Sequence, residues 1–498
     1  MQNIFVLQNL LTVAINNTLT KFTVPQGYIN WRSEADGYPP GYSTLDYNFD
    51  FFNYAGIHRP VLLHTTPKKL YITDITVNTK VGEDLSADFS FDVKYFIKNQ
   101  EKENIQCNVQ LLDGSEDNVV DESFSCQDIR HLKSPKLWWP YLMSANPGYM
   151  YQLKVTVISV KYGMDEFTLP VGLREVTWGS STFNINHKPF YFRGFGRHED
   201  SNIRGKGLDL PLFARDYNLI KWMGANSYRT SHYPYADELM DFADRNGIVI
   251  IDECPGVALD HFDDRLLKNH LQVMTELVQR DKNHPSVVMW SVGNEPKSYR
   301  NQSGEYFRQV ADHTRDLDPS RPVTLVCNAQ WDQDHASQHF DVIAINRYFA
   351  WYSDTGHTEL IMDKLYTDLA NWRHARDKPV MLTEYGADTV AGLHMEPAMV
   401  FTEEYQVQLM KETFKAFDKA RSEGWFIGEH IWNFADFMTK QEPRRVAGNK
   451  KGIFTRDRQP KMSAHLLRSR YWKLAQELDI IDSDDEHQQH FLLSVMDN

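Results

Sequence analysis

The chain lacks two features that would have pointed to a membrane or a nucleic acid. No apolar run approaches the ~18–20 residues that a membrane-spanning helix needs. Basic residues are outnumbered, with 53 Lys and Arg against 67 Asp and Glu, so the 498 residues carry a formal net charge of −14. Such a surface repels phosphate backbones, and no block of Lys and Arg reverses its sign. We therefore expect neither a membrane-embedded nor a nucleic-acid-binding protein.

Cysteine is also scarce. The four residues Cys107, Cys126, Cys254 and Cys327 are too few for a disulfide framework, and none of their spacings resembles a zinc site. Cys107 and Cys126 flank a Gly-containing turn and pair across neighbouring strands if the compartment is oxidising. The alternative, in which all four pack as small hydrophobic thiols, stays open at this level.

The overall composition is that of a globular protein, with 42% hydrophobic and 24% charged residues. Residues 1–65 alternate short β-rich runs with turn clusters. Residues 66–177 show period-two alternation between regular turns, which predicts a small antiparallel β-sandwich. The Trp pair of LWWPY (137–141) within this block is interpreted as core or domain-interface packing.

From residue 178 to 478 the pattern changes to alternating strands and amphipathic helices, and residues 479–498 form an acidic tail. Eight β-then-α units in about 300 residues predict a (β/α)8 barrel. Near-continuous apolar runs are expected of parallel strands that are buried on both faces. The expected strands are 190–196, 226–231, 247–253, 287–295, 323–328, 341–348, 379–386 and 429–437.

Polar side chains follow nearly every one of these strands. In such barrels the carboxyl ends of the strands face the active site, so these side chains are the candidates for chemistry. Arg229, Asp252 and Glu253 have an equally good alternative as buried ion pairs that only brace the rim. A metal site would have to recruit His198, Glu199 and His232, but these come from only two strands, so the metal interpretation is disfavoured.

Two glutamates follow apolar strands abruptly. Glu295 ends VVMWSVGNE and Glu384 ends PVMLTE. Paired carboxyl groups on opposite walls of a barrel mouth suit glycoside hydrolysis, because one protonates the leaving oxygen while the other attacks the anomeric carbon. Aldolases and metal-dependent hydrolases also place carboxylates there, so spacing alone does not decide the reaction.

Longer motifs make the assignment specific. Between Leu10 and Leu478 the sequence resembles the β-glucuronidases of glycoside hydrolase family 2, the animal lysosomal members above all. The resemblance rests on DFFNYAG (50–56), LWWPY (137–141), HEDSNIRGKG (198–207), GANSYRTSHYPYA (224–236), GIVIIDECPG (247–256), RDKNHPSVVMWSVGNEP (280–296), TEYGADTVAG (383–392), IWNFADF (431–437) and NKKGIFTR (449–456).

The resemblance implies roles for individual residues. Glu295 matches the general acid/base, Glu384 the nucleophile, and Tyr348 a tyrosine that assists the nucleophile. Asn294 matches an asparagine that bonds the sugar 2-hydroxyl. Further residues that match the lining of the sugar pocket are Asp50, His232, Asn328, Asn346, Tyr352 and Trp432. No metal or other cofactor is implied.

Substrate specificity is predicted to rest on Arg445 together with Asn449 and Lys451. In this family the Asn-x-Lys pair marks members that are active on glucuronides, whose C6 carboxylate a fixed cation reads directly. We expect these cations to reverse the negative charge of the protein locally. The NRYFAWY motif (346–352) departs from the usual animal form at Arg347 and Phe349, and Arg347 resembles the bacterial form.

The resemblance also implies an architecture. It predicts a partial jelly-roll sugar-binding domain in residues 1–65, an immunoglobulin-like β-sandwich in 66–177, the catalytic barrel in 178–478 and the tail in 479–498. Family members begin with a complete jelly-roll, so the first domain is expected to be truncated and to expose apolar faces. Homotetramers are implied for a complete chain.

The predicted function is that of a retaining exo-β-D-glucuronidase acting on glycosaminoglycan ends and glucuronide conjugates. A related family 2 hydrolase such as a β-galacturonidase is the alternative within the class, and an inactive glycan-binding form is the alternative outside it. The family resemblance implies a lysosomal or secreted protein. The N-terminus shows no signal peptide, whereas the sequons Asn16-Asn17-Thr18 and Asn301-Gln302-Ser303 are compatible with secretion.

Overall fold

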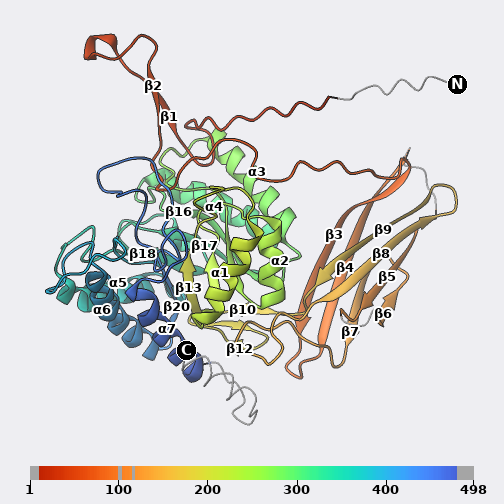
Figure 1. Ribbon diagram of the computed structural model, residues 1–498. Helices are drawn as coiled ribbons and strands as arrows, with labels where there is room; N and C mark the ends of the chain where they lie inside the picture. Colours follow the sequence, from red (N-terminus) through yellow and green to blue (C-terminus); the bar gives the residue numbers. More distant parts are fainter. Residues whose placement is uncertain (1–9, 99–103, 115–117, 479–498) are drawn as a thin grey trace.

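The computed structural model describes residues 10–98, 104–114 and 118–478 (Figure 1). Its centre is a closed barrel of parallel strands that pair in chain order. The strands are β13 (Phe192–Gly196), β14 (Ser227–Arg229), β15 (Val249–Glu253), β16 (Val287–Asn294), β17 (Val323–Cys327), β18 (Val342–Asn346), β19 (Val380–Glu384) and β20 (Phe426–Ile431). The barrel expected from the sequence is therefore confirmed.

The eighth strand lies earlier than expected. We predicted it at 429–437, whereas β20 spans Phe426–Ile431. Beyond Ile431 the chain leaves the sheet, and the Asn433 amide donates to the carbonyl of Lys451 instead of a neighbouring strand. Glu429 and His430 are buried polar residues within this strand. They interrupt its apolar run, so the sequence pattern did not show that the strand begins at Phe426.

Helices surround the barrel and enclose the main apolar core. They are α1 (Leu210–Trp222), α2 (Asp237–Asn246), α3 (Asp264–Asp281), α4 (Asn301–Leu317), α5 (Ile361–Arg376), α6 (Glu403–Ser422) and α7 (Met462–Leu478). Alternate strand residues face opposite sides, so Ile250 packs toward the helices while Val249 and Ile251 fill the barrel interior. No helix in the described part of the chain is long and apolar enough to cross a membrane.

A β-sandwich lies beside the barrel, at the right of Figure 1. One sheet has the order β3 (Leu70–Val81), β4 (Ala87–Ile97), β7 (Gln127–Leu132), and the other β6 (Val119–Ser123), β5 (Gln106–Leu112), β8 (Tyr151–Ser159), β9 (Gly163–Val171). Alternate residues of β4, including Phe89, Phe91 and Val93, point into the shared core. A disulfide joins Cys107 to Cys126, which decides between the two alternatives left open by the sequence.

The sandwich is attached at the end of the barrel where the strands begin. A small sheet of β10 (Val176–Trp178), β11 (Phe183–Ile185) and β12 (Lys188–Pro189) leads from one to the other. Trp138 of LWWPY is fully buried there, and its Nε1 donates to the carbonyl of Asp244 at 2.8 Å. The predicted interface packing of this motif is confirmed for Trp138.

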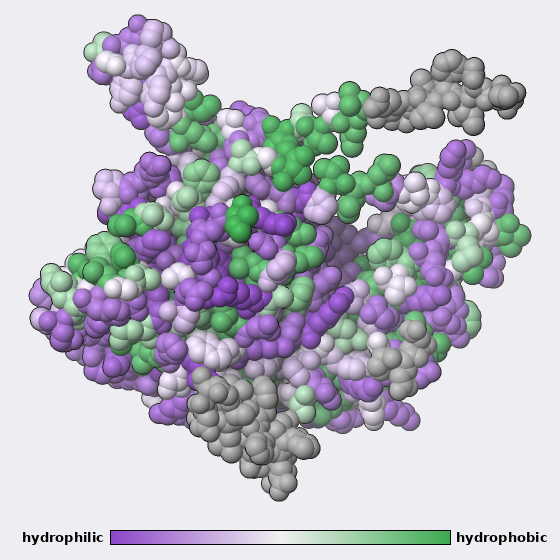
Figure 2. All heavy atoms as spheres, viewed as in Figure 1, coloured by the Kyte–Doolittle hydropathy of each residue, from purple (hydrophilic) through white to green (hydrophobic). Residues whose placement is uncertain are grey.

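The N-terminal region crosses the opposite end of the barrel. β1 (Tyr28–Trp31) and β2 (Ser43–Asp46) form a hairpin that projects away from the barrel at the top of Figure 1. Tyr47 and Phe49 then pack with Val257 in a small core and bring Asp50 to the mouth. Figure 2 shows apolar side chains along this region, where Leu10 and Leu63 are almost fully exposed. The jelly-roll assignment and the domain boundaries stay predictions, and residues 1–9 and the acidic tail lie outside the described residues.

Candidate active site

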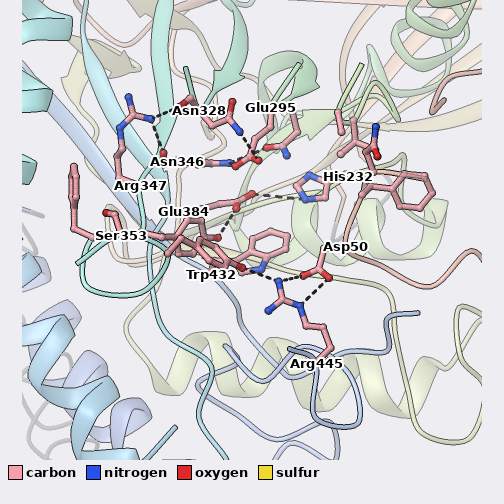
Figure 3. Close-up of a pocket in the computed structure, with 18 of the residues that line it drawn as sticks. Asp50, His232, Glu295, Asn328, Asn346, Arg347, Ser353, Glu384, Trp432 and Arg445 are labelled. Atoms are coloured by element: carbon pink, nitrogen blue, oxygen red, sulfur yellow. Dashed lines mark hydrogen bonds and ion pairs between the residues drawn. The ribbon is translucent and has the colours of Figure 1, made fainter. Parts of the chain in front are cut away.

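A cavity of about 350 Å³ opens at the carboxyl ends of the barrel strands (Figure 3). Eleven of the thirteen predicted site residues line it, and they come from the ends of six strands and the loops that follow them, together with the N-terminal region. These eleven are Asp50, His232, Asn294, Glu295, Asn328, Asn346, Tyr348, Tyr352, Glu384, Trp432 and Arg445. The other two, Asn449 and Lys451, are fully buried next to the cavity wall.

Glu384, the predicted nucleophile, ends β19 and is held at both oxygens. Its Oε1 accepts from Arg229 Nη2 at 2.5 Å, and its Oε2 accepts from the Tyr348 hydroxyl at 2.6 Å. Burial raises the pKa of Glu384 to about 8, against the opposing effect of Arg229; the nearby charge of Glu295 also acts to raise it. Arg229 is therefore the only full cation that bonds directly to this carboxyl group among the described residues.

The sequence left open whether Arg229, Asp252 and Glu253 serve the chemistry or only form ion pairs that brace the rim. The contacts of Arg229 answer part of this question. Its Nη1 donates to both oxygens of Glu253 at 2.8 Å, and Glu253 in turn bonds His232 Nδ1 at 2.8 Å. Arg229 and Glu253 thus form a buried ion pair, but one that reaches the pocket through Glu384 and His232. Asp252 takes no part in this ion pair and accepts from Thr230 Oγ1 at 3.0 Å. Position at the end of β14 was the signal that could have placed Arg229 in the site.

Glu295, the predicted acid/base, has different partners. It directly follows β16 with a φ of 49°, and its carboxyl oxygens accept from the side-chain amides of Asn346 at 2.8 Å and Asn328 at 2.9 Å. Asn294 lies beside them, because its Oδ1 also accepts from Asn346 Nδ2 at 3.1 Å. Burial raises the pKa of Glu295, and the amide donors act in the opposite direction.

The two carboxyl groups therefore differ in how well they hold a negative charge. Burial raises the pKa of both, so the pair favours holding a proton near neutral pH. Glu384 bonds a guanidinium, whereas Glu295 is hydrogen-bonded by neutral amides. Although burial raises the pKa of Glu384, the bonded guanidinium favours the charge on Glu384 and leaves the proton to Glu295. A pocket with one acid and one carboxylate can carry out acid-assisted displacement.

The other end of the pocket holds Arg445, Asn449 and Lys451, which were predicted to bind a uronate carboxylate and are called the clamp from here on. Arg445 donates to Asp50 through Nε at 3.0 Å (Figure 3), and its Nη1 donates to Asp388 at 3.1 Å. Asn449 Nδ2 donates to the second oxygen of Asp50 at 2.8 Å. Tyr352 accepts from Arg445 Nη2 at 2.7 Å, so residues far apart in the chain meet at this point.

Lys451 lies behind this layer. Its Nζ bonds Asp388 at 2.5 Å and the Tyr352 hydroxyl at 2.9 Å. The formal charges of Arg445, Lys451, Asp50 and Asp388 therefore cancel, and our expectation of a local positive excess is wrong for these four groups. Burying two cations without counter-charges is costly, which explains the two carboxylates. Sequence reasoning missed Asp388, because a single Asp in a loop gave no signal beyond its place four residues after Glu384.

The remaining predicted residues form the wall between these two ends. Trp432 stacks on His232 with ring centroids 5.0 Å apart and planes at 19°. Burial lowers the pKa of His232, which favours a neutral ring. An apolar face of this kind matches the hydrophobic face of a sugar ring.

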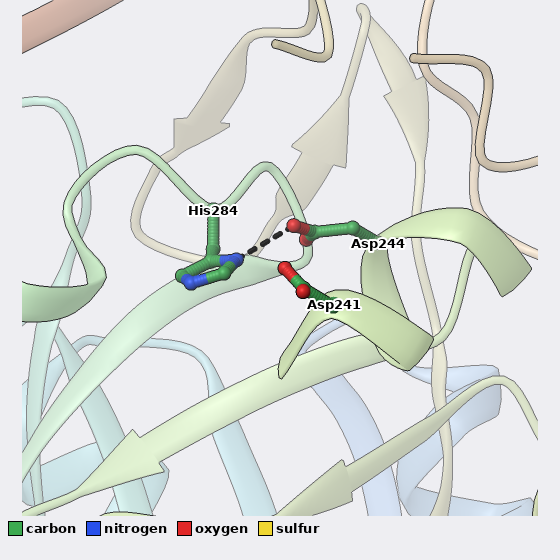
Figure 4. Close-up of side chains that lie close together, drawn as sticks. All are labelled: Asp241, Asp244 and His284. Atoms are coloured by element: carbon green, nitrogen blue, oxygen red, sulfur yellow. Dashed lines mark hydrogen bonds and ion pairs between the residues drawn. The ribbon is translucent and has the colours of Figure 1, made fainter. Parts of the chain in front are cut away.

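The residues of the disfavoured metal alternative are each engaged elsewhere. Glu199 pairs with Arg59 at 2.6 Å, and His198 Nδ1 contacts the Tyr233 hydroxyl at 3.1 Å. Within the described ranges, the one cluster with metal-like spacing is Asp241, Asp244 and His284 (Figure 4).

That cluster is better explained as an ion pair. Asp244 accepts from His284 Nδ1 at 2.6 Å and from the Ser286 amide at 3.0 Å. Burial acts to lower the pKa of His284, but the charge of Asp244 outweighs it and raises this pKa to about 9. A protonated imidazole donates hydrogen bonds and does not ligate a metal.

Comparisons with known proteins agree with this geometry. Residues 176–476 match the family model described as glycosyl hydrolases family 2, TIM barrel domain, and residues 70–174 match glycosyl hydrolases family 2. The chain is 51% identical over 470 residues to the mouse β-glucuronidase, covering 94% of this chain and 71% of the mouse protein. The human β-glucuronidase is 50% identical over 473 residues, with the same coverage of 94% and 71%.

Solved structures give the same result. The β-D-glucuronidase of Dictyoglomus thermophilum superimposes with a TM-score of 0.86 at 44% identity, covering 92% of this chain and 78% of that one. The Ruminococcus gnavus β-glucuronidase in complex with D-glucuronic acid gives 0.82 at 33% identity, covering 92% and 76%. With the closed barrel, the paired glutamates and these matches together, the chain belongs to glycosyl hydrolase family 2.

Proposed function

We propose that this protein is a retaining exo-β-D-glucuronidase. The observation that carries the proposal is the unequal environment of two glutamates in one pocket, Glu384 against a guanidinium and Glu295 against neutral amides. Arg445 at the other end of the pocket supports a carboxylated sugar, since a guanidinium matches a carboxylate in charge and shape. Relatives named β-glucuronidase support the same substrate class.

The mechanism has two displacement steps. In the first, the Glu384 carboxylate attacks the anomeric carbon while Glu295 gives its proton to the glycosidic oxygen, so the bond to the aglycone breaks and the alcohol leaves. In the second, Glu295 removes a proton from water, which attacks the anomeric carbon and releases Glu384. Two inversions return the β-configuration, and this route requires the carboxyl groups to lie about 5–5.5 Å apart.

Tyr348 and Arg229 keep Glu384 in place for this reaction. The Tyr348 hydroxyl donates to Oε2 of Glu384, and burial raises the pKa of Tyr348 well above its usual value, so it remains a donor. Arg229 stabilises the carboxylate that attacks and leaves. Neither bond has to be broken for Glu384 to reach the sugar with its remaining lone pairs.

We also infer that the natural substrates are glycosaminoglycan ends and glucuronide conjugates, and that the protein is lysosomal or secreted. The Cys107–Cys126 disulfide supports an oxidising compartment. Asn16 and Asn301 of the two sequons are both exposed, which supports a glycoprotein. The glucuronic acid bound to the Ruminococcus gnavus relative supports the same sugar in this pocket.

One assay tests the activity. The 498-residue chain is incubated with 4-nitrophenyl β-D-glucuronide at acidic and neutral pH, and in parallel with the β-D-galacturonide and β-D-glucoside. We expect release of nitrophenol from the glucuronide above all, with β-glucuronic acid as the first product by NMR. Preference for the galacturonide, an α-configured first product, or no turnover by folded protein would each refute the proposal.

A further inference from the structure

Arg347 is a buried arginine at the edge of the pocket to which no role has been given. It follows β18, and its guanidinium bonds Asp368 on α5 at 2.5 Å through Nε. Its remaining N–H groups donate to the backbone carbonyls of Asn346 at 2.7 Å, Asn328 at 3.2 Å and Ala329 at 2.8 Å. One planar fork thus joins the end of β18, helix α5 and the loop that follows β17, and Figure 3 shows Arg347 beside Asn328 and Asn346.

That loop carries Asn328, whose side chain is exposed but whose Nδ2 donates to Oε2 of Glu295 at 2.9 Å. An exposed amide has no packing to hold it, so its position depends on the backbone beneath it. Arg347 fixes this backbone at two successive carbonyls, those of Asn328 and Ala329. Arg347 is therefore bonded to the stretch of backbone from which the Asn328 side chain reaches Glu295.

The anchor of this arrangement is itself rigid. Asp368 is only 8% exposed, and it holds the Arg347 guanidinium in one orientation from α5. A buried cation keeps its place when a carboxylate neutralises it and its other donors find acceptors, as the three carbonyls here provide. Asp368 was not singled out by sequence, because it lies in the middle of a helix with no polar strand end beside it.

We propose that Arg347 is a positioning residue for the acid/base of the reaction. By holding the loop at Asn328 and Ala329, it places the Asn328 amide on Glu295 and so fixes the plane of the acid. The same amide stabilises the carboxylate that remains once Glu295 has given its proton to the glycosidic oxygen. The inference rests on the proposed function, since it concerns the step in which the aglycone leaves.

Leaving groups of different basicity test this role. An alkyl glucuronide needs its oxygen protonated as the bond breaks, whereas 4-nitrophenolate leaves with little help, so only the first substrate depends on a well-placed acid. For Arg347→Met we expect kcat/KM on methyl β-D-glucuronide to fall about 10–100-fold, part of the ~10²–10⁴ that general acid catalysis contributes. On 4-nitrophenyl β-D-glucuronide we expect a loss within about threefold. Equal losses on both substrates would overturn the proposal.

Arg347→Lys covers the case in which the Met variant does not fold. Lys keeps an ion pair with Asp368 but lacks the planar fork that holds two carbonyls at once. We expect it to fold with a near wild-type melting temperature and still to lose more activity on the methyl than on the nitrophenyl substrate. Wild-type selectivity in this variant would show that charge alone matters and would contradict positioning by the fork.

Arg376 provides the matched control. It lies on α5, as Asp368 does, and its guanidinium donates to Ser337 Oγ at 2.8 Å and to the carbonyls of Trp331 at 3.2 Å and Asp334 at 3.0 Å. It therefore braces the same connecting segment without touching Asn328 or the pocket. We expect Arg376→Met to lower the melting temperature without changing the ratio between the two substrates. A ratio change as large as that of Arg347→Met would mean a general effect of the loop.

A double-mutant cycle completes the test. Asn328→Ala should show the same leaving-group dependence as Arg347→Met, and the double variant should lose little more than either single one. Fully additive losses would show that Arg347 acts by another route. Wild-type hydrolysis of both substrates is measured first, so failure of the proposed function is seen before, and apart from, failure of this inference.

Discussion

Two buried arginines, Arg174 and Arg229, lie at opposite ends of the barrel and have opposite surroundings. Arg174 bonds the carbonyls of Pro285 at 3.0 Å and Val287 at 2.8 Å, where β16 begins. Arg229 bonds the carboxylates of Glu253 and Glu384, where the strands end. Burial lowers the pKa of Arg174, whereas the carboxylates outweigh burial and raise the pKa of Arg229.

The difference shows that one type of side chain has a structural role at one end of the barrel and a role in the active site at the other. Arg174 connects the sandwich linker to the barrel through neutral acceptors, as expected of the end that supports stability. Arg229 does not line the cavity itself, but its partner Glu384 does and is therefore placed to react. Substitutions at the mouth should therefore change activity, and substitutions at the base should change stability.

The largest effect is expected from Glu384→Gln. The amide keeps the shape of the side chain but cannot attack the anomeric carbon, so kcat should fall at least about 10³-fold on every substrate. Glu429→Gln is the control, because Glu429 is equally buried but faces Tyr191 and Arg470 outside the pocket. Measured per folded molecule, its kcat should stay near wild type, and more than trace turnover by Glu384→Gln would end the nucleophile assignment.

The clamp should show a smaller and selective effect. Lys451→Ala removes a cation and leaves Asp50 and Asp388 with Arg445 as their shared ion-pair partner, so the charge near a uronate carboxylate becomes net negative. We expect the ratio of kcat/KM between glucuronide and glucoside to fall about 100-fold, or ~2.7 kcal/mol. Lys450→Ala should leave the ratio unchanged, because Lys450 points to Asp436 at 3.7 Å. Equal losses on both sugars would remove Lys451 from substrate recognition.

Asp388→Asn should modestly strengthen binding of the glucuronide. The amide oxygen can still accept from Lys451, while the lost charge leaves the clamp with a net positive charge. A unit charge about 6–8 Å from the uronate at an effective dielectric of about 20 is worth ~2 kcal/mol, and the weaker hydrogen bonds from Arg445 and Lys451 to the new amide offset most of this gain. We expect KM for the glucuronide to fall roughly threefold, with no change for the glucoside. If KM rises instead, Asp388 acts mainly by holding Lys451.

The sequence predicted which residues lie at the mouth of the barrel better than it predicted which residues pair with one another there. The eight strands were recognisable because buried parallel strands read as apolar runs, and Glu295 and Glu384 stood out where such runs stop. β20 was placed three residues late because Glu429 and His430 are buried within it, one paired with Arg470 and the other with Ser227. Polar residues whose partners lie far along the chain break the pattern on which such predictions depend.

The clamp also depends on partners that lie far along the chain, which the sequence pattern does not reveal. Arg445 and Lys451 were predicted from a motif, but their counter-charges Asp50 and Asp388 come from loops about 400 and 60 residues away in the chain. Arg347 was noticed only as a departure from the usual motif. Its four bonds to a helix, a strand and a loop follow from tertiary packing, which no local spacing encodes.

The base of the barrel should respond in stability alone. His284 lies before β16 and pairs with Asp244, which raises the His284 pKa from 6.5 to about 9. Because the folded pKa is raised, this stabilisation is fully present below pH 6.5 and is lost as pH rises through about 9. A shift of this size corresponds to about 3 kcal/mol, so His284→Asn should lower the melting temperature at pH 6 and progressively less toward pH 9.

His131→Asn separates this effect from histidine loss in general. His131 also meets a carboxylate, Asp88 at 2.7 Å, but the pair is exposed on the sandwich, where ion pairs contribute little. We expect its melting temperature to follow wild type at every pH, and both variants to keep wild-type kcat/KM per folded molecule. Loss of activity in His284→Asn at a temperature where it is folded would mean that the base of the barrel communicates with the mouth, and the division between the two ends would have to be abandoned.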